Sequence, residues 1–318
     1  MTEQPSNPAA EVVRFDAAEK RFGTTTALAG LSFAVARGEM FGLIGPDGAG
    51  KTTAIRLLCG LLHPDAGRVT VLGVDPADRH DAITGRVGYL SQRFTLYGDL
   101  TVDENIEFFA EIRAVRQFRP RREQLLEMTR LTPFRGRLAE RLSGGMKQKL
   151  ALACTLVHEP ELVVLDEPTT GVDPVSRREF WKLLSEFLAR GVTIVMSTPY
   201  LDEAERCTRV ALMHEGRVLA ADEPAHLRAR LPGGLLEVVA PGVVGGIDEV
   251  RRVPGVVDVH AFGDRLHVRL GSADAAAVSE FTTRLRGSLA PEASVRAVEA
   301  SLEDVFIATL EQQEHADA

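Results

Sequence analysis

The fold is decided by the stretch Gly45-Pro46-Asp47-Gly48-Ala49-Gly50-Lys51-Thr52-Thr53, which matches the P-loop pattern G-x-x-x-x-G-K-[ST]. The apolar segment 40–44 precedes it like a buried strand, and Ile55, Leu58 and Leu62 follow it at helical spacing. This strand–loop–helix context is the one that the motif requires. The glycines let backbone N–H groups face bound phosphates, and the following helix points its positive dipole end at the same oxygens.

Two side chains of this loop have specific predicted tasks. Lys51 is predicted to reach the β- and γ-phosphates of a nucleotide, and the Thr52 hydroxyl is predicted to hold Mg²⁺. The alternative is a glycine-rich turn that fits the pattern by chance, and the motifs further along the chain count against it.

Length and composition are those of a globular protein. The 318 residues suggest two domains, or one large domain with an appendage. The hydrophobic content of 45% and the charged content of 26% are ordinary for a soluble protein, and the net charge of -8 argues against a nucleic-acid partner. Since no apolar run approaches the ~18 residues of a membrane helix, any membrane role is expected to come through a partner.

The N-terminus and the cysteines carry no visible chemistry. Residues 1–10 are polar and are expected to form a disordered tail, not a signal peptide. Cys59, Cys154 and Cys207 lie far apart without zinc spacing. We expect them to be small buried hydrophobes in a reducing cytosol.

Two residues outside the P-loop are candidates for ligand contact. Phe22 lies between a charged pair and Gly23, in a predicted turn that would expose its ring for stacking on a nucleotide base, although a core position remains open. Gln92 is the last residue of the strand-like segment 86–92. Open α/β sheets bind ligands at the carboxyl ends of their strands, so Gln92 is either a ligand contact or an ordinary surface glutamine.

A second possible anion site begins at Ser143-Gly144-Gly145. An apolar stripe of Leu150, Ala153, Cys154 and Val157 follows it, so these residues are expected at the start of a helix. Simple capping of that helix by Ser143 is the alternative.

The apolar run 162–165 ends in two carboxylates, Asp166 and Glu167. Acidic groups at the end of a buried strand are costly unless a metal or a polarised water accompanies them. Asp166 fits the acid on the Mg²⁺ side of P-loop nucleotidases, and Glu167 fits the base that orients an attacking water. The alternative, that both acids cap the next helix, is weakened by Pro168 directly after them.

Together, in this order and spacing, the motifs resemble the ATP-binding cassette of ABC transporters over residues 11–230. The resemblance implies an α/β P-loop NTPase fold with a helical signature subdomain, and ATP and Mg²⁺ as ligands. It implies roles for the following residues: Phe22 as the adenine-stacking aromatic, Gly45 to Thr53 as Walker A, Gln92 as the Q-loop glutamine at the metal or water, Ser143 to Gly145 in the signature, Asp166 and Glu167 as Walker B, and Asp173 as the D-loop aspartate.

In this family two cassettes pair head to tail, and each ATP lies between one P-loop and the other cassette's signature. A second cassette, identical or different, and a polytopic membrane subunit are therefore implied partners, at the cytoplasmic face of the membrane. Two residues depart from the family pattern: Asp47 replaces an asparagine, with a small expected effect, and Pro199 replaces a histidine. Neither His158 nor His214 is expected to substitute, since both belong to neighbouring elements.

Residues 231–318 form a separate predicted domain. Strands are expected at 235–239, 256–262, 265–270 and 294–298, with helices at 247–253 and 274–286, capped by Asp274 and ended by Gly287. This β-α-β-β-α-β order is the ferredoxin-like α+β pattern. The stretch 301–306 then resembles the tail motif of daunorubicin-resistance-type exporter ATPases.

The function expected from the resemblance is that of an ATP-hydrolysing subunit of a drug or antibiotic exporter, slowed by Pro199. The alternative is a weakly hydrolysing regulatory cassette paired with a catalytic partner, which Pro199 favours and Glu167 opposes. A soluble cassette protein acting on ribosomes or DNA is disfavoured by the net charge and by the single cassette.

Overall fold

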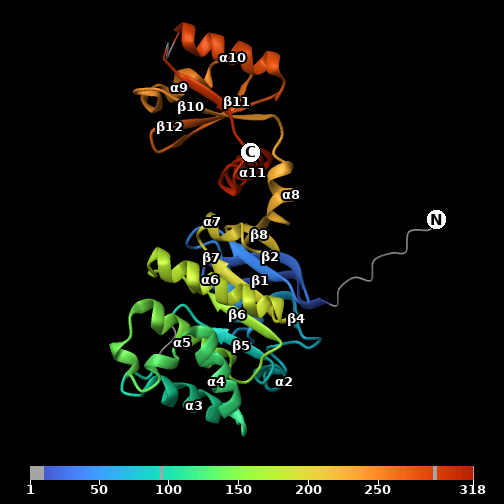
Figure 1. Ribbon diagram of the computed structural model, residues 1–318. Helices are drawn as coiled ribbons and strands as arrows, with labels where there is room; N and C mark the ends of the chain where they lie inside the picture. The colour runs from blue at the N-terminus through green and yellow to red at the C-terminus, as the bar shows by residue number, and fades with distance from the viewer. Residues whose placement is uncertain (1–10, 94–95, 289–291, 318) are drawn as a thin grey trace, which may run out of the picture. The chain divides into compact units, whose positions relative to one another are not determined.

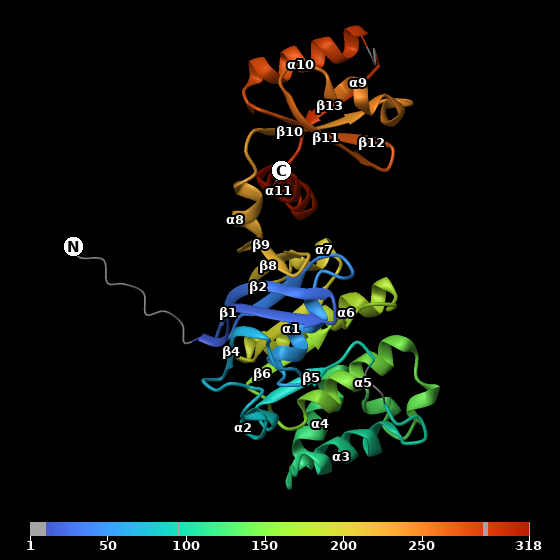
Figure 2. The ribbon, with the colours of Figure 1, turned by 180° about the vertical axis from the view of Figure 1, so that it is seen from behind.

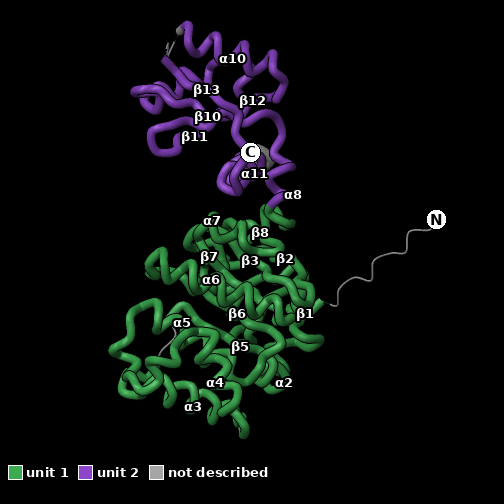
Figure 3. Tube along the Cα trace, in the orientation of Figure 1, with its two compact units in different colours: residues 1–224 green, residues 225–318 purple. Residues whose placement is uncertain are grey.

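The computed structural model describes residues 11–93, 96–288 and 292–317. The chain divides into two compact units, 1–224 and 225–318 (Figure 3). The division follows Pro224, at the start of helix α8 (Pro224–Ala229), whereas the sequence places the boundary after Arg230. The tail predicted for residues 1–10 lies outside the described residues.

Unit 1 is built on a six-stranded sheet with the strand order β5-β6-β7-β3-β8-β9 (Figure 1). Its strands are β3 (Met40–Ile44), β5 (Val87–Leu90), β6 (Leu162–Asp166), β7 (Thr193–Thr198), β8 (Arg209–His214) and β9 (Arg217–Asp222). All neighbours run parallel except β8 and β9, which form an antiparallel hairpin. Strands β3 and β6 are buried along their whole length, as expected of continuous apolar runs in a parallel sheet.

A three-stranded antiparallel sheet of the order β2-β1-β4 completes the α/β architecture. It contains β1 (Glu11–Phe22), β2 (Thr25–Ala36) and β4 (Ala66–Val71). Phe33 of β2 stacks on Phe41 of β3 with ring centroids 5.2 Å apart, so aromatic packing joins the two sheets. Helix α1 (Lys51–Leu58), which begins directly after the P-loop, contacts strands of both sheets (Figure 2).

Three of the remaining helices of unit 1 form a helical subdomain. Its members α3 (Val102–Ile112), α4 (Phe118–Thr129) and α5 (Gly144–Leu156) pack on one another (Figure 1). Helix α3 begins with a capping box, because Thr101 accepts a hydrogen bond from the Glu104 amide and Glu104 accepts one from the Thr101 amide. The others are α2 (His80–Thr84), α6 (Pro174–Ala189), α7 (Leu201–Ala204) and the 3₁₀ turns η1 (Thr132–Phe134) and η2 (Ala139–Arg141).

Unit 2 has a four-stranded antiparallel sheet of the order β11-β12-β10-β13. Its elements are β10 (Gly234–Val239), η3 (Val243–Gly246), α9 (Ile247–Arg251), β11 (Val256–Phe262), β12 (Arg265–Leu270), α10 (Ala275–Ser288), β13 (Ser294–Ala297) and α11 (Leu302–Asp317). The predicted β-α-β-β-α-β order is present, and its assignment to the ferredoxin-like class stays a prediction. Asp274 accepts the Ala277 amide at the start of α10, as predicted.

The predicted stop at Gly287 is wrong, because α10 continues to Ser288. A single glycine near a helix end costs only about 1 kcal/mol relative to alanine. Packing of Phe281 and Leu285 into the core of unit 2 is therefore sufficient to carry the helix past it.

We predict that a chain ending at Arg230 still binds ATP within about 2-fold of the full chain, because each unit has its own hydrophobic core. A titration with a fluorescent ATP analogue, alongside a thermal unfolding curve, measures this. Complete loss of nucleotide binding from a folded truncated chain would show that unit 2 is part of the cassette fold.

Candidate nucleotide-binding site

The P-loop leaves β3 and turns into α1 over residues 45–50. Gly48 and Gly50 have φ of +83° and +98°, a left-handed conformation that favours glycine. The Lys51 side chain is buried, and its Nζ donates hydrogen bonds to the carbonyls of Gly45 at 2.8 Å and Pro46 at 2.9 Å. The predicted phosphate lysine therefore lies folded across its own loop.

The carboxyl ends of β3, β6 and β7 meet at this edge of the sheet. Asp166 ends β6 with only 1% of its surface exposed. Its Oδ1 accepts hydrogen bonds from the Thr52 hydroxyl at 3.1 Å and from the Ser197 hydroxyl at 2.7 Å. Thr52 and Asp166, which the sequence places far apart, thus present their oxygens side by side, and such oxygens are the ligands that Mg²⁺ prefers.

Glu167 lies beside the lysine and the glutamine that were predicted to share its site. Its Oε1 is 3.4 Å from Lys51 Nζ, and its Oε2 accepts a hydrogen bond from Gln92 Nε2 at 2.9 Å. The residue is buried and has φ of +48°, which is unusual for a non-glycine residue. Left-handed backbone of this kind costs roughly 1–3 kcal/mol and clusters at active sites, where it fixes the direction of a side chain.

Ser197 is a functional residue that the sequence reasoning missed. It is the next-to-last residue of the buried strand β7 and pairs in register with Asp166. Its Oγ accepts the Glu167 amide at 3.0 Å while it donates to Asp166, so one hydroxyl orients both carboxylate residues. The sequence did contain a signal for this residue: Ser197 is a polar residue directly after the apolar run 194–196.

A second missed group is Glu203 of α7, which is 1% exposed. It accepts hydrogen bonds from the hydroxyls of Thr169 at 2.7 Å and Thr198 at 2.8 Å, and Arg177 lies 3.5 Å away. These contacts tie the segment after Glu167 to the segment after β7. They therefore fix the backbone around Pro199.

Phe22 lies at the end of β1 with 48% of its surface exposed, so the core alternative is excluded. Lys20 Nζ is 5.8 Å from its ring centre. The β1–β2 hairpin passes the P-loop, because a Cβ added at Gly50 would lie 2.6 Å from the Ala27 carbonyl oxygen. The exposed ring of Phe22 therefore belongs to a hairpin that adjoins the phosphate-binding loop.

Ser143 and Asp173 cap neighbouring helices. Ser143 accepts the Met146 amide at 3.3 Å at the start of α5, and Asp173 accepts the amides of Val175 and Ser176 at the start of α6. A Cβ added at Gly145 would lie 2.1 Å from Ser176 Oγ, so the two helix starts are in close contact.

His158 and His214, which are not expected to replace the missing histidine, lie beside other groups. His158 lies against the Val87 carbonyl at 3.2 Å, near the amino end of β5, and burial lowers its pKa to about 4. His214 ends β8 and lies 3.9 Å from Glu215. The three cysteines are buried and free, as predicted.

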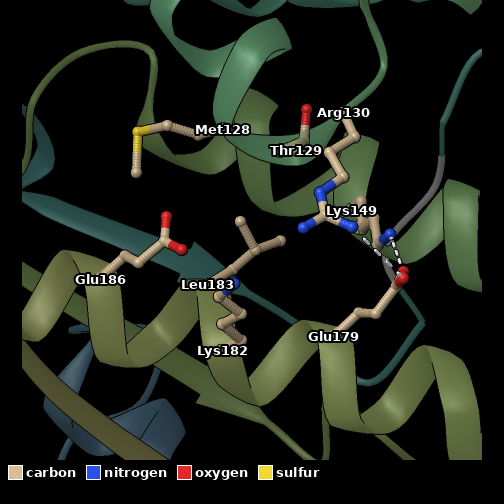
Figure 4. Close-up of a pocket in the computed structure, with 8 residues that line it drawn as sticks. All are labelled: Met128, Thr129, Arg130, Lys149, Glu179, Lys182, Leu183 and Glu186. Atoms are coloured by element: carbon tan, nitrogen blue, oxygen red, sulfur yellow. Dashed lines mark hydrogen bonds and ion pairs between the residues drawn. The ribbon is translucent and has the colours of Figure 1, made fainter.

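A separate cavity of about 30 Å³ lies between α4, α5 and α6 (Figure 4). Lys149 and Arg130 both face Glu179 across it, and Lys149 forms an ion pair with that carboxylate. The cavity is too small for a nucleotide, and Glu179 pairs with two of its cations. It is therefore a structural feature of the helical subdomain.

Comparisons with known proteins agree with this geometry. Residues 28–170 match the protein family described as ABC transporter. The chain is 48% identical over 234 residues to the probable multidrug ABC transporter ATP-binding protein YbhF of Escherichia coli (strain K12), over 72% of this chain but only 40% of that protein. It is 40% identical over 230 residues to the daunorubicin resistance ATP-binding protein DrrA3 of Streptomyces coeruleorubidus, covering 71% of this chain and 73% of that one.

Solved structures show the same fold. An ATP-binding subunit of an ABC transporter superposes with a TM-score of 0.63 at 31% identity, covering 69% of this chain and 92% of the other. The dimeric post-hydrolysis cassette MJ0796, bound to ADP and Pi, superposes with a TM-score of 0.58 at 26% identity, covering 66% and 98%. No helix among the described residues is long and apolar enough to cross a membrane. The chain belongs to the ATP-binding proteins of the ABC transporter family.

Proposed function

We propose that this chain binds and hydrolyses ATP to drive export by a separate membrane subunit. The observation that carries the proposal is the meeting of Lys51, Thr52, Asp166, Glu167 and Gln92 at one sheet edge. Lys51 can contact the phosphates, Thr52 and Asp166 can hold the metal, and Glu167 and Gln92 can contact the attacking water. The names of the relatives, a multidrug and a daunorubicin resistance protein, support a drug or antibiotic as the exported substrate.

The donor set fits Mg-ATP. Thr52 and Asp166 offer adjacent oxygens for Mg²⁺, with Gln92 as a further oxygen at the metal or its water. Mg-ATP, when bound, supplies the phosphoryl group and the charge that polarises it. Lys51 would exchange its contacts with the loop carbonyls for phosphate oxygens, and the loop amides would complete the cradle.

Glu167 is proposed to orient the attacking water and to accept its proton at a carboxylate oxygen. The left-handed backbone and the Ser197 hydrogen bond to its amide hold the residue in place. Gln92, in contact with the same carboxylate, would sense whether the water and metal are present.

We further propose a second cassette as partner, whether the same chain or another. Ser143 and Gly144 are exposed at the start of α5, with amides that suit a phosphate of the opposite site. Asp173 and the exposed ring of Phe22 offer further nucleotide or partner contacts. The related dimeric cassette with ADP and Pi supports this arrangement.

The membrane subunit is proposed to dock beside Gln92, at the cytoplasmic face of the membrane. A cavity of about 400 Å³ is lined there by Arg93 and Leu96, by Glu140 of η2 and by Lys147 of α5. A partner bound in this cavity would contact both the residues next to Gln92 and helix α5, which Ser143 caps. The regulatory alternative has only Pro199 in its favour.

We predict that Lys51→Ala weakens ATP binding by about 10- to 100-fold, because hydrogen bonds to charged groups contribute roughly 1.5–3 kcal/mol. Calorimetric titration with Mg-ATP measures this. Lys149→Ala is the matched control, since it removes a buried lysine of the same unit whose partner is Glu179. If Lys51→Ala is folded and binds ATP like the wild type, the proposed site is wrong.

A further inference from the structure

The sheet of unit 2 has two chemically different faces. Leu266 and Val268 of β12 point into the apolar core that also contains Phe281 and Leu285 of α10. The alternate residue His267 lies on the opposite face, where its Nδ1 is 2.8 Å from Asp304 of α11. Helix α11 therefore contacts the polar face of this sheet.

Three ligand-type side chains converge on that face. Asp258 and His260 are two residues apart on β11 and so point to the same side of the strand. Glu311 comes from α11, two helical turns after Asp304 and on the same helix face. One nitrogen of His260 and one oxygen of each carboxylate all lie within 4.8 Å of one another.

The donors face one another across one small space. His260 Nε2 is in contact with Asp258 Oδ2 and lies 3.6 Å from Glu311 Oε1. The Asp258 side chain is only 9% exposed, while His260 and Glu311 are 26% and 37% exposed. Two carboxylates this close, one of them buried, repel each other unless a proton or a cation lies between them.

We propose that Asp258, His260 and Glu311 form a binding site for a divalent transition metal of the Zn²⁺ class, which joins β11 to α11. The site is independent of the nucleotide site. One imidazole nitrogen and two carboxylate oxygens suit Zn²⁺ better than Mg²⁺ or Ca²⁺, which take oxygen ligands.

The required rearrangement is small. Ligands about 2.0–2.2 Å from a tetrahedral Zn²⁺ lie about 3.3 Å from one another. The 3.6 Å separation of His260 Nε2 and Glu311 Oε1 is already near that value, and the His260–Asp258 contact must open by about 1 Å. Water would complete the fourth position on the half-exposed side of the site.

Arg269 is a positive charge that acts on this site. It pairs in register with Asp258 across β11 and β12, and its charge acts on Glu311. One arginine offsets only part of the charge of two carboxylates. It is therefore expected to reduce the metal affinity without replacing the metal.

The neighbouring pair of His267 and Asp304 provides an internal control for the proposed metal site. His260 and His267 are cross-strand partners, so both histidines reach α11 from the same face. Asp304 also accepts hydrogen bonds from the amide and the hydroxyl of Ser301, which occupy its second oxygen. Among the described residues, the cluster of three ligand-type side chains contains His260 and not His267, so His267 is not expected to bind the metal.

The test is calorimetric titration of the chelator-treated full chain with ZnCl₂, with Co²⁺ absorption to report the ligand geometry. The wild type and His267→Ala are expected to bind one more Zn²⁺ per chain than His260→Ala. In His260→Ala and Glu311→Gln the affinity of this site should fall more than about 100-fold, since even outer partners of a metal ligand contribute 10- to 100-fold. Zn²⁺ should raise the unfolding temperature of the wild type and His267→Ala only.

Each result decides the proposal. Glu311→Gln keeps the size of a partly exposed side chain, so it remains informative if His260→Ala fails to fold. Absence of this Zn²⁺ equivalent in the wild type would overturn the site. Zn²⁺ binding that is unchanged in Glu311→Gln, or lost equally in His267→Ala, would also overturn it and place the metal elsewhere.

Discussion

Glu167→Gln is expected to reduce steady-state ATP hydrolysis by about 10²- to 10⁴-fold, the usual contribution of a general base. Glutamine keeps the shape of the side chain and can still bond to Gln92, but it cannot accept a proton from water. The backbone of residue 167 should stay in place, because its amide is held by Ser197. The loss is therefore expected in turnover and not in folding.

ATP binding should be retained or become tighter in the same variant. The Glu167 carboxylate lies 3.4 Å from Lys51, so the substitution removes a charge that competes with phosphate for the lysine. It also removes repulsion between the carboxylate and the γ-phosphate. Binding without hydrolysis should trap two cassettes around ATP, and sedimentation with and without Mg-ATP measures that dimer.

Glu159→Gln is the matched control for this experiment. Glu159 also has left-handed backbone, with φ of +55°, but its side chain is 71% exposed and pairs with Arg121. It should turn over ATP like the wild type. A Glu167→Gln chain that hydrolyses ATP at the control rate, or stays monomeric with Mg-ATP, would contradict the assignment of Glu167.

The sequence predicted the elements of the site better than their mutual contacts. The buried strand before Asp166 and the glycine loop before Lys51 each have a local signal, so their placement could be predicted. The Ser197 hydrogen bonds depend on the register of β7 against β6, which no local pattern specifies. The left-handed Glu167 and the burial of Glu203 arise in the same way, from neighbours distant in the sequence.

Unit 2 shows the same limit on a larger scale. The four strands that the sequence predicted form one sheet, and Val268 and Phe281 pack in the core of the unit. The partner of the polar face could not be predicted, because α11 follows the last strand and its carboxylates meet His260 and His267 only in three dimensions. Sequence spacing alone hides such a cluster.

Pro199 occupies the position where this family usually has a histidine, and the strand register explains why the position matters. Ile44 pairs with Thr198, so Gly45 of the P-loop and Pro199 leave the sheet side by side. Thr198 is held by Glu203, and the Tyr200 amide donates to Thr198 Oγ1 at 3.1 Å. Residue 199 is therefore held at the phosphate edge, but proline offers neither a side-chain donor nor a backbone N–H.

Pro199→His is accordingly expected to raise the ATPase rate by about 10- to 100-fold. A hydrogen bond to a charged group contributes roughly 1.5–3 kcal/mol, and one that forms mainly in the transition state appears in turnover and not in affinity. ATP binding should change little, because Lys51, Thr52 and the loop amides are unaltered. Steady-state turnover and nucleotide titration at equal Mg²⁺ and ATP separate the two effects.

Pro199→Ala distinguishes the imidazole from the backbone. Alanine restores the N–H but adds no ring, so a rise in Pro199→His alone assigns the effect to the imidazole, and an equal rise in both assigns it to the backbone donor. If the wild type already turns over at a rate ordinary for the family and neither variant raises it, the impaired-site hypothesis is wrong. Another group would then contact the γ-phosphate in place of an imidazole at position 199.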